Sequence, residues 1–170
     1  MTGDRTTVEA QIGRPLRADS TVVARCHLGV PVVVVVPPIL DDGTPFPTRY
    51  WLSCPLARVR VGRLEAAGGV RRMDARVSSD PAFAERLDAA HQRYRAQRDA
   101  DLPAGAVHRP TGGVAGSTGG VKCLHAHYAD HAAGNENPVG ETVAVWVDPL
   151  DCTVPCVVDG ARNPAWSEPR

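Results

Sequence analysis

The residues of this chain best suited to chemistry are one thiol and three imidazoles that lie within nine residues of one another. They are Cys123, His125, His127 and His131. Thiolate and neutral imidazole are preferred ligands of Zn²⁺, and a thiolate is also a strong nucleophile. The cluster therefore predicts a metal site or a reactive thiol, the alternative being a surface helix whose histidines are solvated.

The geometry of this cluster depends on where a helix begins. If the helix begins at Cys123, steps of 100° per residue place Cys123, His127 and His131 on one face. If the chain is still extended over residues 122–125, Cys123 and His125 form a more local pair. Both arrangements keep Cys123 in the site, and its place at a helix N-terminus favours the thiolate form.

Other parts of the chain must complete a metal site, because one helix cannot supply the four ligands of a closed zinc shell. Cys26 and Cys54 are the natural candidates, although a single buried cysteine can also be a small apolar residue. Cys152 and Cys156 are spaced more widely than the usual C-x₂-C pair. They are either incidental or extra ligands, for zinc or for an iron–sulfur cluster.

A hydrolytic site is an alternative to a structural one. No G-x-S-x-G motif or cysteine-protease context is present, so a catalytic triad is not indicated. Asp130 could orient an imidazole, and Glu136 or Glu141 could act as a base beside a metal-bound water. A metal-dependent hydrolase of a phosphorylated substrate would place His127, Asp130 or His131 near that water.

Composition indicates one globular domain. The chain has 170 residues, of which 43% are hydrophobic and 22% charged, and its 19 acidic and 19 basic residues balance. The absence of a basic surplus argues against binding to nucleic acid or to a membrane surface. Residues 1–19 contain no apolar run of signal-peptide length, and the run at 30–36 is too short to span a bilayer. We therefore expect a cytoplasmic protein, whose five cysteines are not paired as disulfides.

The first third of the chain predicts a small antiparallel sheet. Residues 20–25 and 32–36 are rich in β-branched side chains and flank a Gly/Pro turn, which indicates a hairpin. The second of these strands is apolar throughout, as expected of a strand buried on both faces. Residues 48–53 form a third strand, which delivers Cys54 to its end.

About three helices are expected to pack with this sheet in an α+β fold. The first begins near Pro55 and stops at residues 68–69, the second begins near Asp80, and the third spans 123–133.

A last strand is expected at 142–147. Residues 101–120 form a Gly/Pro-rich loop, mobile and suited to a linker or lid. The single domain covers residues 1–150, and residues 151–170 form an irregular, partly disordered tail.

Four segments of the chain carry a family signature, at residues 45–55, 63–68, 121–125 and 137–140. In this order, and within residues 11–147, they resemble the bacterial family of domain of unknown function 501, which is typical of actinobacteria. That family has no established activity, so the resemblance implies no reaction.

The resemblance also bears on the ligands. Members of the family carry Cys-Pro-x-Gly-x-Pro after the first strand, which stands here at residues 26–31 with His27 in place of the first proline. The position of Cys54 is Cys in some relatives and His in others, an exchange typical of a metal ligand. The zinc ligands that the resemblance implies are Cys26, Cys54, Cys123 and His125. The extended Cys-Leu-His geometry is then favoured over the helical one.

Four hypotheses remain for function. The leading one is a structural zinc site that joins the hairpin, the third strand and the last helix, so that metal binding contributes to folding. The others are the metal-dependent hydrolase, an iron–sulfur or thiol-redox protein that uses Cys152 and Cys156, and an interaction module whose protein partner recognises residues 101–120.

Overall fold

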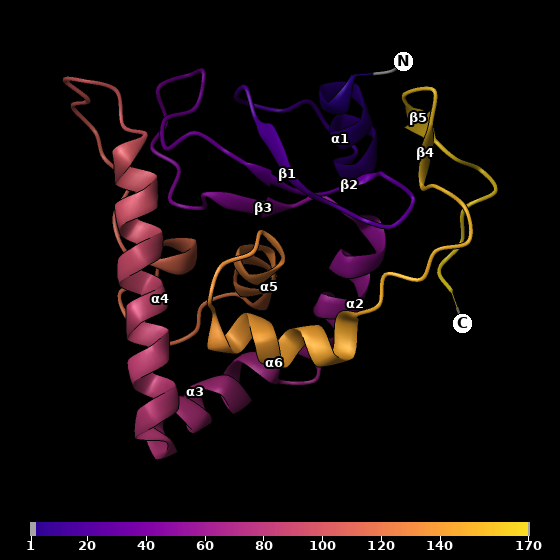
Figure 1. Cartoon of the computed structure of the whole chain (residues 1–170). Coiled ribbons are helices and arrows are strands. Elements are labelled where there is room, and N and C mark those ends of the chain that lie inside the picture. The colour runs from indigo at the N-terminus through magenta and orange to yellow at the C-terminus, as the bar shows by residue number, and fades with distance from the viewer. Residues whose placement is uncertain (1–2, 170) are drawn as a thin grey trace.

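The computed structural model describes residues 3–169 as an α+β fold (Figure 1). Its helices are α1 (Asp4–Ile12), α2 (Pro55–Ala66), α3 (Gly69–Ser79), α4 (Pro81–Ala100), α5 (Leu124–Ala132) and α6 (Pro138–Val147), with one 3₁₀ turn, η1 (Val114–Gly116). Its strands are β1 (Thr21–Arg25), β2 (Pro31–Val35), β3 (Tyr50–Leu52), β4 (Val157–Val158) and β5 (Ala161–Arg162). The predicted fold class is confirmed.

The main sheet has the order β1-β2-β3, and both strand pairs are antiparallel. It contains the predicted hairpin and the predicted third strand. β2 is the central strand and is buried on both faces: Val33 belongs to the main core, whereas Val34 packs with Val8 of α1 on the opposite face. Burial on both faces explains why β2 is apolar throughout and does not alternate.

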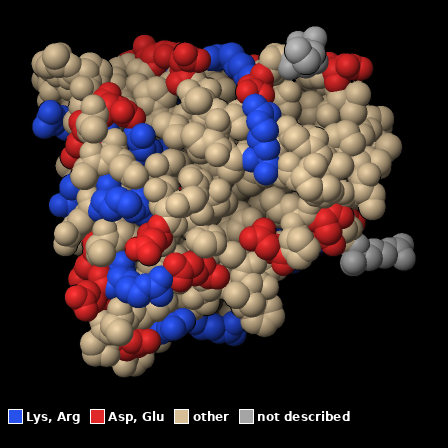
Figure 2. All heavy atoms as spheres, viewed as in Figure 1, with Lys and Arg blue, Asp and Glu red and all other residues tan. Residues whose placement is uncertain are grey.

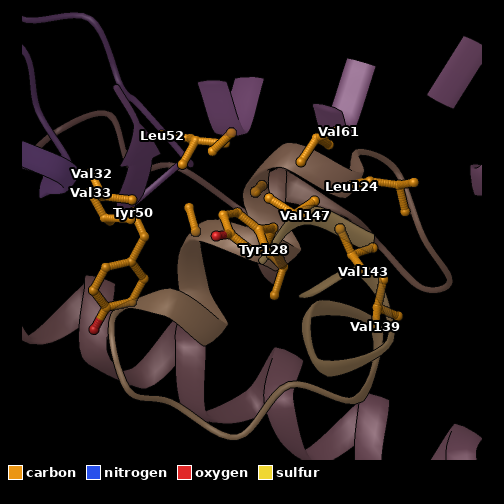
Figure 3. Packing of buried hydrophobic residues seen from close by; sticks show 14 of the residues in the cluster. Val32, Val33, Tyr50, Leu52, Val61, Leu124, Tyr128, Val139, Val143 and Val147 are labelled. Carbon is orange, nitrogen blue, oxygen red and sulfur yellow. The ribbon is translucent and has the colours of Figure 1, made fainter. Parts of the chain in front are cut away.

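Helix α5 lies beneath the sheet and is the centre of the main core (Figure 1). The side chain of Tyr128, only 1% exposed, lies in the middle of this cluster in Figure 3. Around it pack Leu52 of β3, Val61 of α2 and Val147 of α6. The sheet and α5 therefore bury each other's apolar faces, and α2 and α6 close the core from the other side.

The predicted strand at residues 142–147 is wrong, because these residues belong to α6. The run of β-branched residues favoured a strand, but Val139, Val143 and Val147 are spaced four apart and form one buried stripe of a helix. The start of the helix is well specified. The Asn137 side chain accepts a hydrogen bond from the backbone N–H of Gly140 at 2.9 Å, and Pro138 occupies the first turn.

Helix α3 was not among the predicted helices. Gly68 does end α2, in the left-handed conformation with φ of 85°, but a new helix follows at once and continues to Ser79. This helix is rich in arginine, and none of its residues is fully buried. Val70, Met73 and Val77 pack on the edge of the core at helical spacing, but the Gly68-Gly69 pair before them favoured a turn, and the helix was therefore missed.

The segment at residues 101–120, predicted as a mobile loop, is attached to α4 over its second half. The Arg98 side chain, 1% exposed, donates hydrogen bonds to the carbonyl oxygens of Thr111 and Gly112 at 3.3 and 2.8 Å. His91 Nδ1 accepts from the backbone N–H of Val114 at 3.0 Å. These buried contacts hold η1 against α4, so this part of the segment is packed on the fold and is not a free loop.

The C-terminal segment lies beside α1, where β4 and β5 form a small hairpin (Figure 1). Cys156 and Val157 are buried against Val30 at the tip of the main hairpin, with Trp166 beside them. The tail is therefore packed on the sheet rather than irregular throughout.

Charged side chains of both signs are interspersed on the face drawn in Figure 2. Many of them pair across elements, as Arg86 of α4 does with Glu141 of α6 at 2.7 Å. None of the helices within residues 3–169 is long and apolar enough to cross a membrane.

We expect Gly140→Ala to destabilise the protein by about 1–3 kcal/mol, because α5 and α6 meet at this glycine. A Cβ at this position would lie 2.3 Å from the carbonyl oxygen of His127 and 2.5 Å from the Cβ of His131. Gly62→Ala is the matched control, since Gly62 lies in helix α2 and, apart from that helix's own backbone, no atom of the described chain lies within 4 Å of the added methyl. This control should stabilise by about 0.5–1 kcal/mol through helix propensity. Urea denaturation of both variants measures the contrast, and a loss of stability in both would contradict the packing argument.

Candidate metal centre

Three ligand-type side chains from two distant segments meet at the start of α5. Within residues 3–169, the one group of three or more whose ligand atoms all lie within 4.8 Å of one another is Glu65, Cys123 and His125. Glu65 comes from the last turn of α2, Cys123 precedes α5, and His125 lies in its first turn. All three side chains are partly buried.

The backbone around Cys123 explains how the cluster forms. Cys123 is extended, with φ of −153° and ψ of 121°, and the helix begins at Leu124. The backbone N–H of Leu124 donates to Glu65 Oε1 at 2.7 Å, so a carboxylate from α2 caps the first turn of α5. This cap fixes Glu65 beside Cys123. It is the extended Cys-Leu-His arrangement, one of the two alternatives, that the structure contains.

His125 is held at both ring nitrogens. Nδ1 lies 3.2 Å from Glu65 Oε1, and Nε2 lies 3.1 Å from the carbonyl oxygen of Arg58. The interaction with Cys123, and then the negative charge of Glu65, raise the pKa of His125 to about 9 against the opposing effect of burial. At neutral pH both nitrogens then carry protons, and the Nδ1 proton points to the carboxylate.

An open hollow of about 270 Å³ lies next to this cluster. Cys123 and His125 form part of its wall, together with Tyr50 and Trp51 of β3 and the exposed Arg58 of α2. A small molecule can therefore reach the thiol and the imidazole from solvent. The Arg58 guanidinium makes no ion pair in the described part of the chain, and leaves a cation available at this hollow.

The other residues predicted in α5 lie outside this group. His127 is fully buried, and its Nδ1–H donates to Asn137 Oδ1 at 3.1 Å. The Cβ of His131 faces Gly140 of α6. Asp130 is also fully buried and pairs with Arg93 of α4. These side chains join α5 to α4 and α6, a structural role.

The structure does not bring the four predicted zinc ligands together. Cys123 and His125 meet at the start of α5, but Cys26 and Cys54 line a separate cavity. Cys152 and Cys156, which ranked lower as ligands, line that same cavity. The five cysteines of the chain are therefore divided between two places.

Sequence reasoning missed Glu65. Its carboxylate reaches Cys123 only because α2 and α5 pack together, and no local pattern around residue 65 indicates this contact. One signal was present, since Glu65 lies in the segment 63–68 that carries the family resemblance.

The fold and the site define an α+β protein with a Cys/His/Glu centre at the start of its central helix. The chain belongs to the family described as "Protein of unknown function (DUF501)", whose family model matches residues 22–145. No curated protein and no solved structure matches the chain. The matched region contains Glu65, Cys123 and His125, and it ends before Cys152 and Cys156.

Proposed function

We propose that this protein is a zinc-dependent hydrolase whose metal is bound by Glu65, Cys123 and His125. The observation that carries the proposal is the meeting of these three ligand atoms within 4.8 Å beside an open hollow. Catalytic zinc sites use three protein ligands and leave a fourth position for water, whereas structural sites are closed by four. The metal would lower the pKa of a bound water, which supplies the nucleophile.

The surroundings of His125 support this assignment. Its Nε2–H faces the Arg58 carbonyl, and such a hydrogen bond to the second nitrogen is typical of zinc-bound histidines. This leaves Nδ1 as the ligand atom, on the side of Glu65 and Cys123. In the metal-free protein a proton occupies Nδ1, so metal binding would displace that proton.

Arg58 suggests the class of substrate. Its unpaired guanidinium at the hollow suits an anion, and guanidinium groups bind phosphate oxygens in a bidentate manner. A phosphate ester bound there would place its reacting group near Cys123 and His125. We infer a phosphorylated substrate, whose organic part would lie against the wall that β3 contributes to the hollow.

A second candidate function is thiol chemistry at Cys123. Cys123 and His125 are in contact and form the kind of Cys–His pair that cysteine enzymes use, and Glu65 and the Arg58 carbonyl hold the imidazole ring in place. The pKa of His125, raised to about 9 chiefly by Cys123, favours this pair of groups. This chemistry needs no metal. The zinc content of the purified protein therefore distinguishes the two candidate functions.

We expect Cys123→Ser and His125→Gln each to lose one equivalent of zinc per chain relative to wild type. His131→Gln on the same helix is the matched control and should retain it. Elemental analysis of untagged, anaerobically purified protein measures the difference. Unchanged zinc in both site variants would contradict the metal assignment and leave the thiol candidate, which rapid alkylation of Cys123 by iodoacetamide would support.

The hydrolytic part of the proposal has its own test. Zinc-loaded wild type should hydrolyse p-nitrophenyl phosphate, and Cys123→Ser should reduce kcat at least ~100-fold, since a lost ligand removes the bound water. Arg58→Gln should retain zinc but raise KM for the phosphate ester more than for uncharged p-nitrophenyl acetate. Zinc-loaded protein without activity on either ester would overturn the hydrolase and leave a zinc-binding site.

A further inference from the structure

We propose that Cys26, Cys54, Cys152 and Cys156 form a second metal site, a structural Zn²⁺ site with four cysteine ligands that fastens the C-terminal segment to the sheet. This inference is independent of the proposed hydrolase, because it involves none of the residues of the first site.

The four cysteines come from three separate parts of the fold. Cys26 follows β1 directly, and Cys54 follows the end of β3 and precedes α2. Cys152 and Cys156 lie after α6, in the segment that leads to β4. Their x₃ separation is within the range found between paired zinc ligands. A metal at their meeting point would join the hairpin, the third strand and the tail.

All four side chains line one cavity, which Trp166 and Gln11 of α1 also line. The cavity measures about 10 Å³, which is the space of a single water-sized sphere. An organic ligand cannot enter such a space, but one metal ion can. The size and the thiol lining together point to a soft cation, and Zn²⁺ is the common one for four cysteines.

N–H groups point at the sulfurs, as they do around metal-bound thiolates. Trp166 Nε1–H donates to Cys152 Sγ at 3.3 Å, and Gln11 Nε2–H donates to Cys156 Sγ at 3.5 Å. Cys54 receives hydrogen bonds from backbone N–H groups in the first turn of α2. Three of the four sulfurs therefore already have the donors that a negatively charged sulfur needs.

An ordinary apolar core would explain a single buried cysteine but does not explain this grouping. Four of the five cysteines in a chain of 170 residues line this one small cavity. All four are free thiols in largely apolar surroundings. Zinc binding would release their protons and supply the compensating charge.

Metal binding must draw the sulfurs closer. No three of these four sulfurs lie within 4.8 Å of one another in the described chain. A tetrahedral site with Zn–S bonds of about 2.3 Å requires S–S separations of about 3.8 Å. Metal binding therefore requires rotation about the Cα–Cβ bonds of these cysteines and tightening of the turn between Cys152 and Cys156. All four are free thiols in this structure, so no disulfide has to be broken.

The first test uses the unaltered full-length chain, prepared without metal under reducing conditions and titrated with Co²⁺. Binding at the four cysteines should give the intense near-ultraviolet charge-transfer absorption of several Co–thiolate bonds, and one equivalent of Zn²⁺ should abolish it. X-ray absorption of the zinc form of Cys123→Ser, which removes the ligand set of the first site, should show a shell of four sulfurs. A mixed nitrogen and oxygen shell, or no zinc, would overturn the proposal.

The second test separates the two sites by mutation. The double variant C152S/C156S should lose one zinc per chain and show faster amide exchange in residues 151–169. Cys123→Ser, as the control, should keep that zinc and that protection. The proposal is overturned if C152S/C156S retains the wild-type zinc content. It is also overturned if mass spectrometry finds a disulfide among these cysteines in protein kept anaerobic, or if the metal is iron in a coloured cluster.

Discussion

Replacing Asp130 by alanine should destabilise the protein by about 3 kcal/mol or more, because it breaks a buried ion pair on one side only. The Asp130 carboxylate is fully buried and accepts two hydrogen bonds from Arg93, at 3.1 and 2.5 Å. It also accepts one from Asn137 Nδ2 at 2.9 Å. The substitution would leave the guanidinium of Arg93 and the Asn137 amide without this partner.

The loss should extend to the start of α6 and to its contact with α5. Asn137 caps α6 through Gly140 and binds His127 of α5 through the same oxygen, and Asp130 fixes the orientation of that amide. Without the carboxylate, the cap and the histidine contact both weaken. The effect on stability is therefore larger than that of one hydrogen bond.

Glu141→Ala is the matched control. Glu141 also accepts two hydrogen bonds from an arginine of α4, Arg86, but this pair lies at the surface, with 39% and 52% of the two side chains exposed. Removal of the Glu141 carboxylate should lower the free energy of unfolding by at most about 1 kcal/mol. Urea denaturation of both variants gives the comparison. Equal losses in the two variants would show that burial does not govern the strength of these pairs.

Acidification from pH 6.5 to pH 4 should remove about 3 kcal/mol of stability through His127 alone. Burial, and secondarily the nearby His91, lower the pKa of His127 to about 4, against a hydrogen bond with Asn137 that raises it. In the unfolded chain the histidine titrates near 6.5. Between these values the unfolded state binds a proton that the folded state excludes, so stability is full above pH 6.5 and falls as the pH drops toward 4.

His91 should also contribute to the loss of stability on acidification. Its ring lies 5.8 Å from that of His127 in an edge-to-face arrangement, and burial lowers its pKa as well. Protonation of either ring would place a positive charge next to the other. The fully buried Nε2 of His127 has no hydrogen-bond partner in the described chain to compensate such a charge.

The measurement is urea denaturation of wild type and His127→Asn at intervals between pH 4 and pH 8. The variant should be less stable at pH 8 but should lose less stability on acidification, and the difference between the two curves isolates this group from the carboxylates. His108→Asn, at an exposed position, serves as the control and should follow the wild-type curve. A variant with the full wild-type dependence on pH would contradict the assignment.

The parts of the fold that could be predicted are those with strong local signals. The β-branched runs and the turn at residues 26–31 predicted the hairpin, and Pro55 and Pro81 marked helix starts that the structure confirms. Helix α6 was missed because β-branched residues outweighed its cap at Asn137, and tertiary packing decides between helix and strand there. Helix α3 was missed although Val70, Met73 and Val77 follow helical spacing, because the glycine pair at its start favoured a turn.

In the candidate sites, too, contacts between residues close in sequence could be predicted and contacts between distant residues could not. The pairing of Cys123 with His125 depends on two residues that are close in sequence, and it was among the alternatives that the sequence allowed. The contribution of Glu65, and the meeting of Cys54 with Cys156, depend on how α2 packs against elements far away in the chain. A sequence pattern cannot measure such distances without the fold.

The position of α5 beneath the sheet has a consequence for the order in which the protein can assemble on the ribosome. The three strands of the sheet are complete at Leu52, but the helix that covers their apolar face begins only at Leu124, and α6 closes the core at Val147. The sheet is therefore synthesised well before its covering, and Val33 and Leu52 remain open to water during that interval. A nine-residue helix such as α5 is not stable alone in water. The core must therefore form late and in one step, and a nascent chain stalled before α6 would expose a surface that chaperones recognise.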